Sequence, residues 1–325
     1  MSLNEPTRSL SHEFRTRRIN VGGSGGGGYG THDVNTEALR QQVRRDLQRQ
    51  EFLVEVNRYL GDQLSEFNDR DTDAVGSRLD QIASALGDEV EGFDRLLFGG
   101  SIAKHTYVDG LSDVDALVIV GGDRPGDPGE LIARFAQTLE RALLRGTVTS
   151  VTPGALAVTV TYADGVEIQL LPARQRGGTV SIASEDGRGW RDIRPRKFAE
   201  KLTEVNGANN GAVVPAIKLA KGAIGQLPDR DRLTGYHIEA IAVDAFRSYE
   251  GSVSRDGVLR HLLDHAATAV LRPTGDITGQ SVHLDDHLGP ANSPDRQRIS
   301  ASLGRIVSKM DSATSVEDYK EIFGD

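Results

Sequence analysis

The stretch LFGGSIAKHTYVDGLSDVDALVIV, residues 97–120, joins two apolar runs through a glycine turn and an Asp-Val-Asp segment. The first run ends at Phe98 and meets two glycines, a pattern typical of a strand followed by a tight turn. Residues 102–107 are expected to form a short helix, and residues 116–120 a second, buried strand. The stretch therefore predicts a strand–turn–helix–strand unit.

The glycine turn has the composition of an anion-binding loop. Gly100 lets backbone N–H groups approach a ligand, and the start of the following helix favours negative charge. Ser101 adds a hydroxyl donor at the same point. His105 is either a further donor or a solvated helix residue. A phosphate group is the expected ligand of this turn.

Two carboxylates follow at the start of the second strand. Because strand side chains alternate, Asp113 and Asp115 project to one face while Val114 faces the core. Two like charges this close need a cation, and paired carboxylates suit Mg²⁺ (or Mn²⁺) together with substrate phosphates. Either motif alone is common on protein surfaces. A phosphate turn beside a carboxylate pair is the arrangement that phosphoryl transfer requires.

Composition narrows the class of protein. The 325 residues include 38 Lys and Arg against 47 Asp and Glu, a net charge of −9 that argues against a protein that coats duplex nucleic acid. The absence of cysteine excludes disulfides, thiolate nucleophiles and Cys-based metal sites. No apolar run approaches the ~18 residues that span a bilayer. No membrane association and a cytoplasmic location are expected, because the first residues also lack the apolar core of a signal peptide.

Three segments are expected along the chain. Residues 1–33 form a Gly-rich leader that is expected to be disordered. Residues 34–197 are expected to form an α/β domain, with a helix at 34–65 bracing both lobes. Residues 198–325 are expected to form a helical domain with a C-terminal tail. Periodicity predicts further helices at 73–86, 131–144, 198–206, 213–226, 235–250, 255–270 and 294–310, and strands at 93–98, 148–152, 156–162 and 166–171.

On residues 99–115 the sequence resembles the nucleotidyltransferase superfamily of the DNA polymerase β type. Within it, the chain is most similar to the oligoadenylate-synthetase and cyclic GMP–AMP-synthase branch, which includes the bacterial CD-NTases of antiphage defence. The resemblance covers about residues 40–310 and is looser outside the motif. It implies an α/β (α+β) lobe with a small mixed sheet and a mostly helical second lobe. It also implies nucleoside triphosphate substrates, a cyclic or linear oligonucleotide product and an effector protein of a defence operon as a partner.

The family's third carboxylate lies on a strand that runs into a proline, here in GVEIQLLPA, residues 165–173. In much of the branch the acid stands three residues before the proline, where this chain has Gln169. In the polymerase-like members it stands five before, where this chain has Glu167. Glu167 is therefore the expected third metal-site residue. The other readings are that Gln169 suffices with slower turnover, or that the site binds nucleotide without polymerising it.

The helical third resembles the family's second domain. Lys218 and Lys221 lie three apart on one helical face, where the family has a lysine that contacts the triphosphate. Tyr236 matches a ring that often stacks on a base. The competing readings are solvated lysines and a half-buried core tyrosine.

Two other functions remain open from the sequence. One is nucleotidyl transfer to another acceptor, which could be a nucleic acid, a small molecule or a protein tyrosine such as Tyr319. The other is a catalytically impaired homologue that binds nucleotide and regulates a partner, a reading suggested by Gln169.

Overall fold

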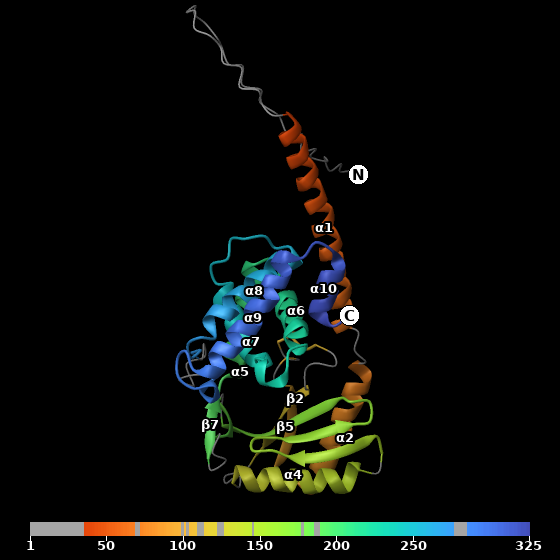
Figure 1. Cartoon of the computed structure of the whole chain (residues 1–325). Helices are drawn as coiled ribbons and strands as arrows, with labels where there is room; N and C mark the ends of the chain where they lie inside the picture. Colours follow the sequence, from red (N-terminus) through yellow and green to blue (C-terminus); the bar gives the residue numbers. More distant parts are fainter. Residues whose placement is uncertain are drawn as a thin grey trace, which may run out of the picture. The chain divides into compact units, whose positions relative to one another are not determined.

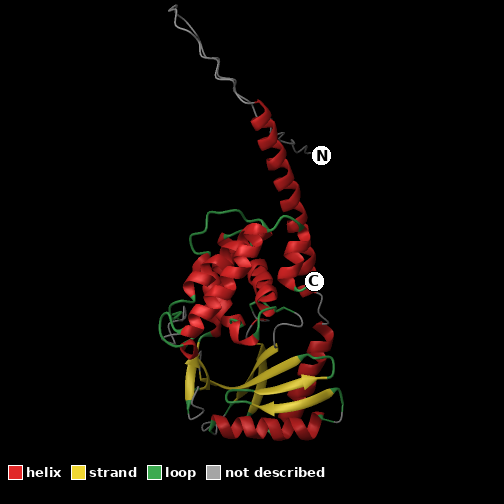
Figure 2. Cartoon of the chain, viewed as in Figure 1, coloured by secondary structure: helices red, strands yellow, loops and turns green. Residues whose placement is uncertain are grey.

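The structure, a computed structural model, describes residues 36–68, 72–98, 101, 104–108, 114–121, 127–144, 146–176, 179–184, 189–275 and 285–325. The predicted leader, residues 1–33, lies outside them. The chain divides into two units, Met1–Asp46 and Leu47–Asp325, and the two lobes described below belong to the second unit. Both lobes are visible in Figure 2 as a sheet region and a helical region.

The first lobe is built on a mixed sheet of seven strands within the described residues, in the order β1-β2-β5-β4-β3, with β6 paired to β5 and β7 paired to β6. The central pair, β2 and β5, is parallel, and the other pairs are antiparallel. The strands are β1 (Phe93–Phe98), β2 (Val114–Val120), β3 (Val148–Pro153), β4 (Val158–Tyr162), β5 (Glu167–Arg176), β6 (Thr179–Ala183) and β7 (Trp190–Ile193).

Two helices, α2 (Thr72–Glu89) and α4 (Pro128–Leu143), supply apolar side chains to one face of this sheet (Figure 1). Helix α4 begins where Asp127 accepts hydrogen bonds from the next backbone N–H groups, with proline in the first turn. Its Phe135 is fully buried in the apolar cluster that also contains Ile82 of α2 and Leu170 of the sheet. The opposite face of β2 and β5 carries a smaller apolar cluster and polar residues, because strand side chains alternate.

The second lobe packs helices around one large apolar cluster. Hydroxyl caps at Thr234, Ser254, Ser293 and Ser315 set the starts of four of these helices. The elements are α5 (Pro195–Ala208), α6 (Val213–Gly225), α7 (Gly235–Ala245), α8 (Arg255–Ala269), α9 (Pro294–Ser312) and α10 (Val316–Phe323), with short turns η1 (Asp229–Asp231) and η2 (Asp286–Leu288).

The long helix α1 (Thr36–Asn68) contributes Val56 and Leu60 to the helical cluster. Phe52 and Tyr59 of α1 meet rings of α10 edge to face, and Figure 1 shows the two helices side by side there. Within the unit Leu47–Asp325, the apolar packing of α1 is thus with the helical lobe.

The expected fold class is confirmed, and one local expectation is wrong. The helix expected at 102–107 does not include Lys104–Val108, which form a turn and extended chain with His105 at φ 59°. Strands β6 and β7 were not expected. The expected C-terminal tail includes helix α10, which is stabilised by a Ser315–Asp318 capping box. Within the described residues, no helix has the length and hydropathy needed to cross a bilayer.

Candidate active site

Three of the predicted site residues share one face of the sheet. Asp115 of β2 and Glu167 and Gln169 of β5 lie on the side opposite α2 and α4, where Leu117 and Leu171 follow at alternate positions. Asp115 pairs in register with Gln169, and all three polar side chains are partly exposed. The sheet thus places a carboxylate beside an amide, with a second carboxylate two residues away along β5.

The neighbouring strand β4 contributes hydroxyl groups to this face. Thr159 is in register with Gln169, and Thr161 with Glu167. The Thr161 hydroxyl donates a hydrogen bond to the Glu167 carboxylate at 3.3 Å. Asp113, the first aspartate of the predicted pair, lies outside the described residues.

The turn that follows β1 is tied to the helical lobe. Gly100 lies outside the described residues, while Ser101 is buried. The Ser101 carbonyl accepts a hydrogen bond from the Thr106 N–H at 2.9 Å. The Thr106 hydroxyl in turn donates to the carboxylate of Glu239 on α7. A residue of the predicted phosphate turn is therefore held, through Thr106, by a helix of the other lobe.

Glu239 forms ion pairs with two lysines at this contact between the lobes. Its side chain is 1% exposed and forms ion pairs with Lys104 and, at 3.0 Å, with Lys221 of α6. The Lys221 ammonium also donates to the Thr106 carbonyl at 2.9 Å. Lys221 thus bridges the segment of residues 104–108 and the helical lobe.

The electrostatics of this cluster keep Glu239 ionised. Burial raises the pKa of Glu239, but Lys104 and Lys221 outweigh that effect, so its pKa lies below the ordinary value. Burial lowers the pKa of Lys221, and the charge of Glu239 offsets part of that shift. The carboxylate of Asp115 also acts on Lys221. Asp115 is the last and smallest of the charges that raise the pKa of this lysine.

The other predicted lysine has different surroundings. Lys218 is half-buried, and its ammonium donates to the side chain of Asn68 at the end of α1. It lines a cavity of about 320 Å³, together with His105 and Tyr107 of the segment after the phosphate turn. Lys218 and Lys221 lie on one face of α6, yet Lys221 is the one that contacts Glu239.

Tyr236 forms part of an aromatic pair. Its side chain is 39% exposed, and its ring centroid lies 4.7 Å from that of Phe198, with the planes tilted by 42°. The Lys104 ammonium lies 4.9 Å from the Tyr236 centroid and 4.8 Å from that of Phe198. The ring predicted to stack on a base thus adjoins the lysine and glutamate cluster.

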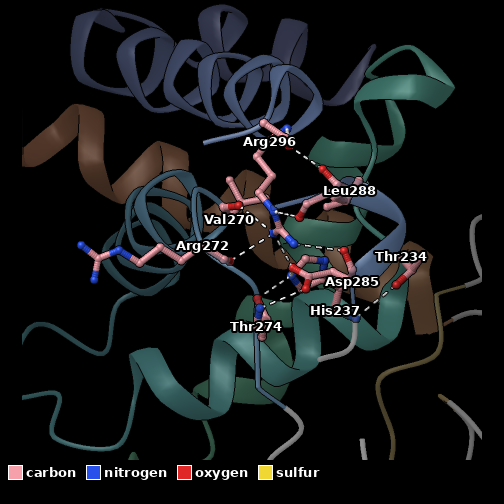
Figure 3. Close-up of polar contacts among 10 residues, drawn as sticks. Thr234, His237, Val270, Arg272, Thr274, Asp285, Leu288 and Arg296 are labelled. Carbon is pink, nitrogen blue, oxygen red and sulfur yellow. Dashed lines mark hydrogen bonds and ion pairs between the residues drawn. The ribbon is translucent and has the colours of Figure 1, made fainter. Parts of the chain in front are cut away.

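A buried polar network follows directly after Tyr236 on α7, as Figure 3 shows. His237 Nε2 lies 2.9 Å from the Thr274 hydroxyl and 3.3 Å from the Asp285 carboxylate. Asp285 also accepts a hydrogen bond from Arg296 at 2.7 Å, and Asp285 and Arg296 are fully buried. Burial lowers the pKa of His237 to about 4. The network fixes residues on both sides of 276–284 against α7.

Sequence reasoning missed Lys104, Glu239 and the Arg296–Asp285 pair. Glu239 stands three residues after Tyr236, but its partner Lys104 is 135 positions away. A charged residue in an apolar helix was the available signal, since α7 is otherwise mostly buried apolar residues. Arg296 and Asp285 lie in tracts with no such contrast.

The donors on the sheet face suit a hard cation. Carboxylate oxygens of Asp115 and Glu167 and the amide oxygen of Gln169 are ligand types that Mg²⁺ accepts. Among the residues that the structure describes, no three His, Cys, Asp or Glu side chains gather closely enough to hold a metal ion. Asp113 is not among those residues, so the described part of the face supplies a portion of the predicted ligand set.

No protein-family model matches the chain, and no curated protein sequence matches it. Several solved structures, in contrast, are similar to the chain in fold. CdnC of E. coli MS115-1 with ATP is 19% identical, covers 78% of this chain and 91% of its own, and has a TM-score of 0.55. The CD-NTase CdnG of Bradyrhizobium diazoefficiens with GTP is 16% identical, with coverages of 77% and 89% and a TM-score of 0.60.

The third similar structure is the Vibrio cholerae DncV cyclic AMP-GMP synthase in complex with the linear intermediate 5′ pppA(3′,5′)pG. It is 15% identical, covers 90% of each chain and has a TM-score of 0.59. These likenesses extend over both lobes and agree with the resemblance found in the motif. The chain has the fold of the CD-NTases.

Proposed function

We propose that this protein is a nucleotidyltransferase that joins nucleoside triphosphates into a cyclic or linear oligonucleotide signal, in the cytoplasm and in antiphage defence. The observation that carries the proposal is the sheet face shared by Asp115 and Glu167, on which Asp115 lies in register with Gln169. Such a carboxylate face suits a metal-bound triphosphate, and Lys221, which donates to the Thr106 carbonyl, supplies a cation near the predicted phosphate turn. The CD-NTase fold supports the same reaction class.

In this proposal, each lobe contributes residues with separate roles in binding the substrate and the metal ion. Gly100 N–H and the Ser101 hydroxyl orient the triphosphate, and Lys221 and Lys218 balance its negative charge. Tyr236 offers a ring on which a base stacks. Asp113, Asp115 and Glu167 would hold Mg²⁺ or Mn²⁺, which when bound stabilises the charge of the reacting phosphate. A hydroxyl of a second nucleotide then bonds to the α-phosphorus, its proton leaves to a base, and the bond to pyrophosphate breaks.

A second candidate function follows from Gln169. A neutral amide in register with Asp115 lowers the negative charge available to a metal, and this favours a protein that binds nucleotide and regulates a partner. Transfer to another acceptor also remains open. Tyr319 does not suit that role, because its side chain is 2% exposed and its hydroxyl donates to Asp256.

An effector protein is proposed as a partner. The solved structures with this fold include a complex of CdnC with a HORMA protein. A protein partner of this chain would bind in addition to the nucleoside triphosphates.

The test is incubation of the purified chain with all four nucleoside triphosphates and Mg²⁺ or Mn²⁺, followed by mass spectrometry of the products. We expect an oligonucleotide and pyrophosphate, and neither from Asp113→Asn or Asp115→Asn. Nucleotide binding with pyrophosphate at background would favour the regulatory function instead. Product from Asp115→Asn at the wild-type rate would contradict the assigned metal site and the regulatory function.

A further inference from the structure

Helix α1 carries an apolar stripe made of exposed residues. Leu39, Val43, Leu47 and Val54 expose 54, 50, 55 and 70% of their surface. At about 100° per residue, these four positions fall within an arc of about 80° on a single continuous helix. An exposed apolar stripe of this length is typical of a face that packs against another helix.

The stripe is separate from the face of α1 that packs into the helical lobe. Val56 and Leu60 belong to that core and are fully buried. Helical geometry puts them about 100° or more from the centre of the stripe. Every residue from Glu37 to Glu51 is exposed. The helix therefore has a second apolar face that the core leaves exposed.

The charges of α1 show which partner this face fits. Residues 37–49 carry four arginines and two acidic residues, whereas residues 50–66 carry four acidic residues and one arginine. Two copies running in the same direction would place like charges alongside each other. Two copies running in opposite directions place the basic half of one beside the acidic half of the other.

The charge complementarity of two antiparallel copies also holds for individual residue pairs. The opposite charges are arranged symmetrically about the point between Leu47 and Gln48. Eight of the nine charged residues between 37 and 58 pair across this point, and Arg45 is the exception; the pairs are Glu37 with Arg58, Arg40 with Glu55, Arg44 with Glu51, and Asp46 with Arg49. In an antiparallel pair each edge of the stripe faces the same edge of its partner. Arg40, Arg44, Glu51 and Glu55 lie on one edge, and Asp46 and Arg49 on the other.

We propose that two copies of this chain associate through α1 as an antiparallel helix pair, with the twofold axis between Leu47 and Gln48. The stripe forms the apolar seam, in which Leu47 meets its own copy and Leu39 meets Val54. The charged edges set the antiparallel direction. A seam of this length is a small interface, so association is reversible and depends on protein concentration.

The first test measures the mass of the full chain in solution by light scattering over a range of concentrations. We expect a shift from one chain to two as concentration rises, weakened by salt because the edges are ionic. Leu47→Glu should raise the dissociation constant at least tenfold. Val253→Glu is the matched control, because Val253 is 51% exposed and lies outside α1. A single-chain mass at every concentration, or equal dimerisation of both variants, would overturn the proposal.

Charge reversal tests the orientation. Arg40→Glu with Arg44→Glu makes these four positions of the edge all acidic, and Glu51→Arg with Glu55→Arg makes them all basic. Each double variant should fail to self-associate, whereas an equimolar mixture of the two should form a mixed dimer, and the fourfold variant should dimerise like the wild type. Wild-type behaviour of either double variant alone would contradict the assigned pairing.

The absence of cysteine allows a direct geometric test. Leu47→Cys should form an intermolecular disulfide under mild oxidation, because Leu47 lies in the seam and its two copies are only about 1.5 Å apart along the helices. Leu39→Cys should not, because at about 1.5 Å per residue its two copies lie about 25 Å apart along an antiparallel pair. Equal cross-linking at both positions would indicate a parallel pair and overturn the proposal.

Discussion

Asp115 on β2 lies in direct register with Gln169 on the parallel strand β5. A carboxylate of the proposed metal site therefore has a neutral amide as its strand neighbour. Glu167 stands two residues earlier on the same face and accepts a hydrogen bond from Thr161. The site can hold three carboxylates only if Glu167 serves as the third, since Gln169 contributes an oxygen without charge.

The first prediction separates these two residues. Glu167→Gln should lower kcat at least about 100-fold, because loss of a metal ligand removes several kcal/mol of transition-state stabilisation. Gln169→Ala should lower it by less than about tenfold, as expected for the loss of one neutral ligand or hydrogen bond. Product formation and thermal unfolding of each variant would be measured together. The assignment of Glu167 fails if Glu167→Gln retains activity while Gln169→Ala does not.

Gln169→Asp adds a test of the impaired-homologue hypothesis. A large gain in turnover would mean that the native amide limits the reaction. Unchanged or lower turnover would agree with Glu167 as the third ligand. Asp115→Asn serves as the inactive reference for both variants.

The sequence predicted the elements that have strong local signals. The strand expected at 93–98 is β1, and the helix expected at 213–226 is α6 to within one residue, because each is a continuous or periodic apolar run between clear breakers. β6 and β7 were not expected, because they are short and carry mixed polar residues. The helix expected at 102–107 does not include His105, because this residue has a left-handed backbone conformation. The spacing of apolar residues does not predict such a conformation.

The site was predictable where it lies within one segment. Alternation along β5 was enough to place Glu167 and Gln169 on one face. The role of Glu239 was not predictable, because Lys104 and Thr106 reach it from the other lobe. Contacts between distant segments depend on the packing of the two lobes.

The second prediction concerns Glu239. Glu239→Ala leaves Lys104 and Lys221 buried without their carboxylate, which should lower the free energy of unfolding by about 3–5 kcal/mol. Glu204→Ala is the control, since Glu204 is 69% exposed and pairs with Lys201 at the surface, a contact worth at most about 1 kcal/mol. Denaturant unfolding of both variants would be compared. Equal losses would contradict a structural role for the buried cluster.

The same cluster should affect nucleotide binding. Glu239→Gln keeps a side chain of similar size but removes the charge that holds Lys221 beside Thr106. We expect KM for the nucleoside triphosphates to rise more than kcat falls, because the lysine loses its fixed position. The measurement is initial-rate kinetics at several triphosphate concentrations. A change in kcat with KM unaltered would place Glu239 outside triphosphate binding.

The third prediction concerns the ring of Tyr236. Tyr236→Ala should weaken nucleotide binding by about 1–3 kcal/mol, which is roughly 5- to 150-fold in affinity, if a base stacks on it. Tyr236→Phe keeps the stacking surface and should bind nearly as the wild type does. Binding of a non-hydrolysable triphosphate by calorimetry gives both values. An equal loss in the two variants would assign the effect to the hydroxyl and not to stacking.

The last prediction is a pH dependence of stability that arises at His237. Burial lowers the pKa of this imidazole to about 4 from 6.5. In the unfolded chain His237 takes up a proton as the pH falls through its ordinary value, whereas in the folded chain it stays neutral until about pH 4. Between about pH 6.5 and pH 4 the unfolded state thus binds more protons than the folded state. The free energy of unfolding therefore decreases as the pH is lowered through this range.

The expected loss is about 2 kcal/mol between pH 7 and pH 5. Asp285 and Glu239, whose pKa values are lowered, are ionised in both states above pH 5 and so change stability only at lower pH. The charges that face His237 are Asp285, Arg296 and His287. Denaturant unfolding at several pH values would show a flatter profile in His237→Gln than in the control His265→Gln. Identical slopes in the two variants would mean that His237 takes up its proton equally in the folded and unfolded chain.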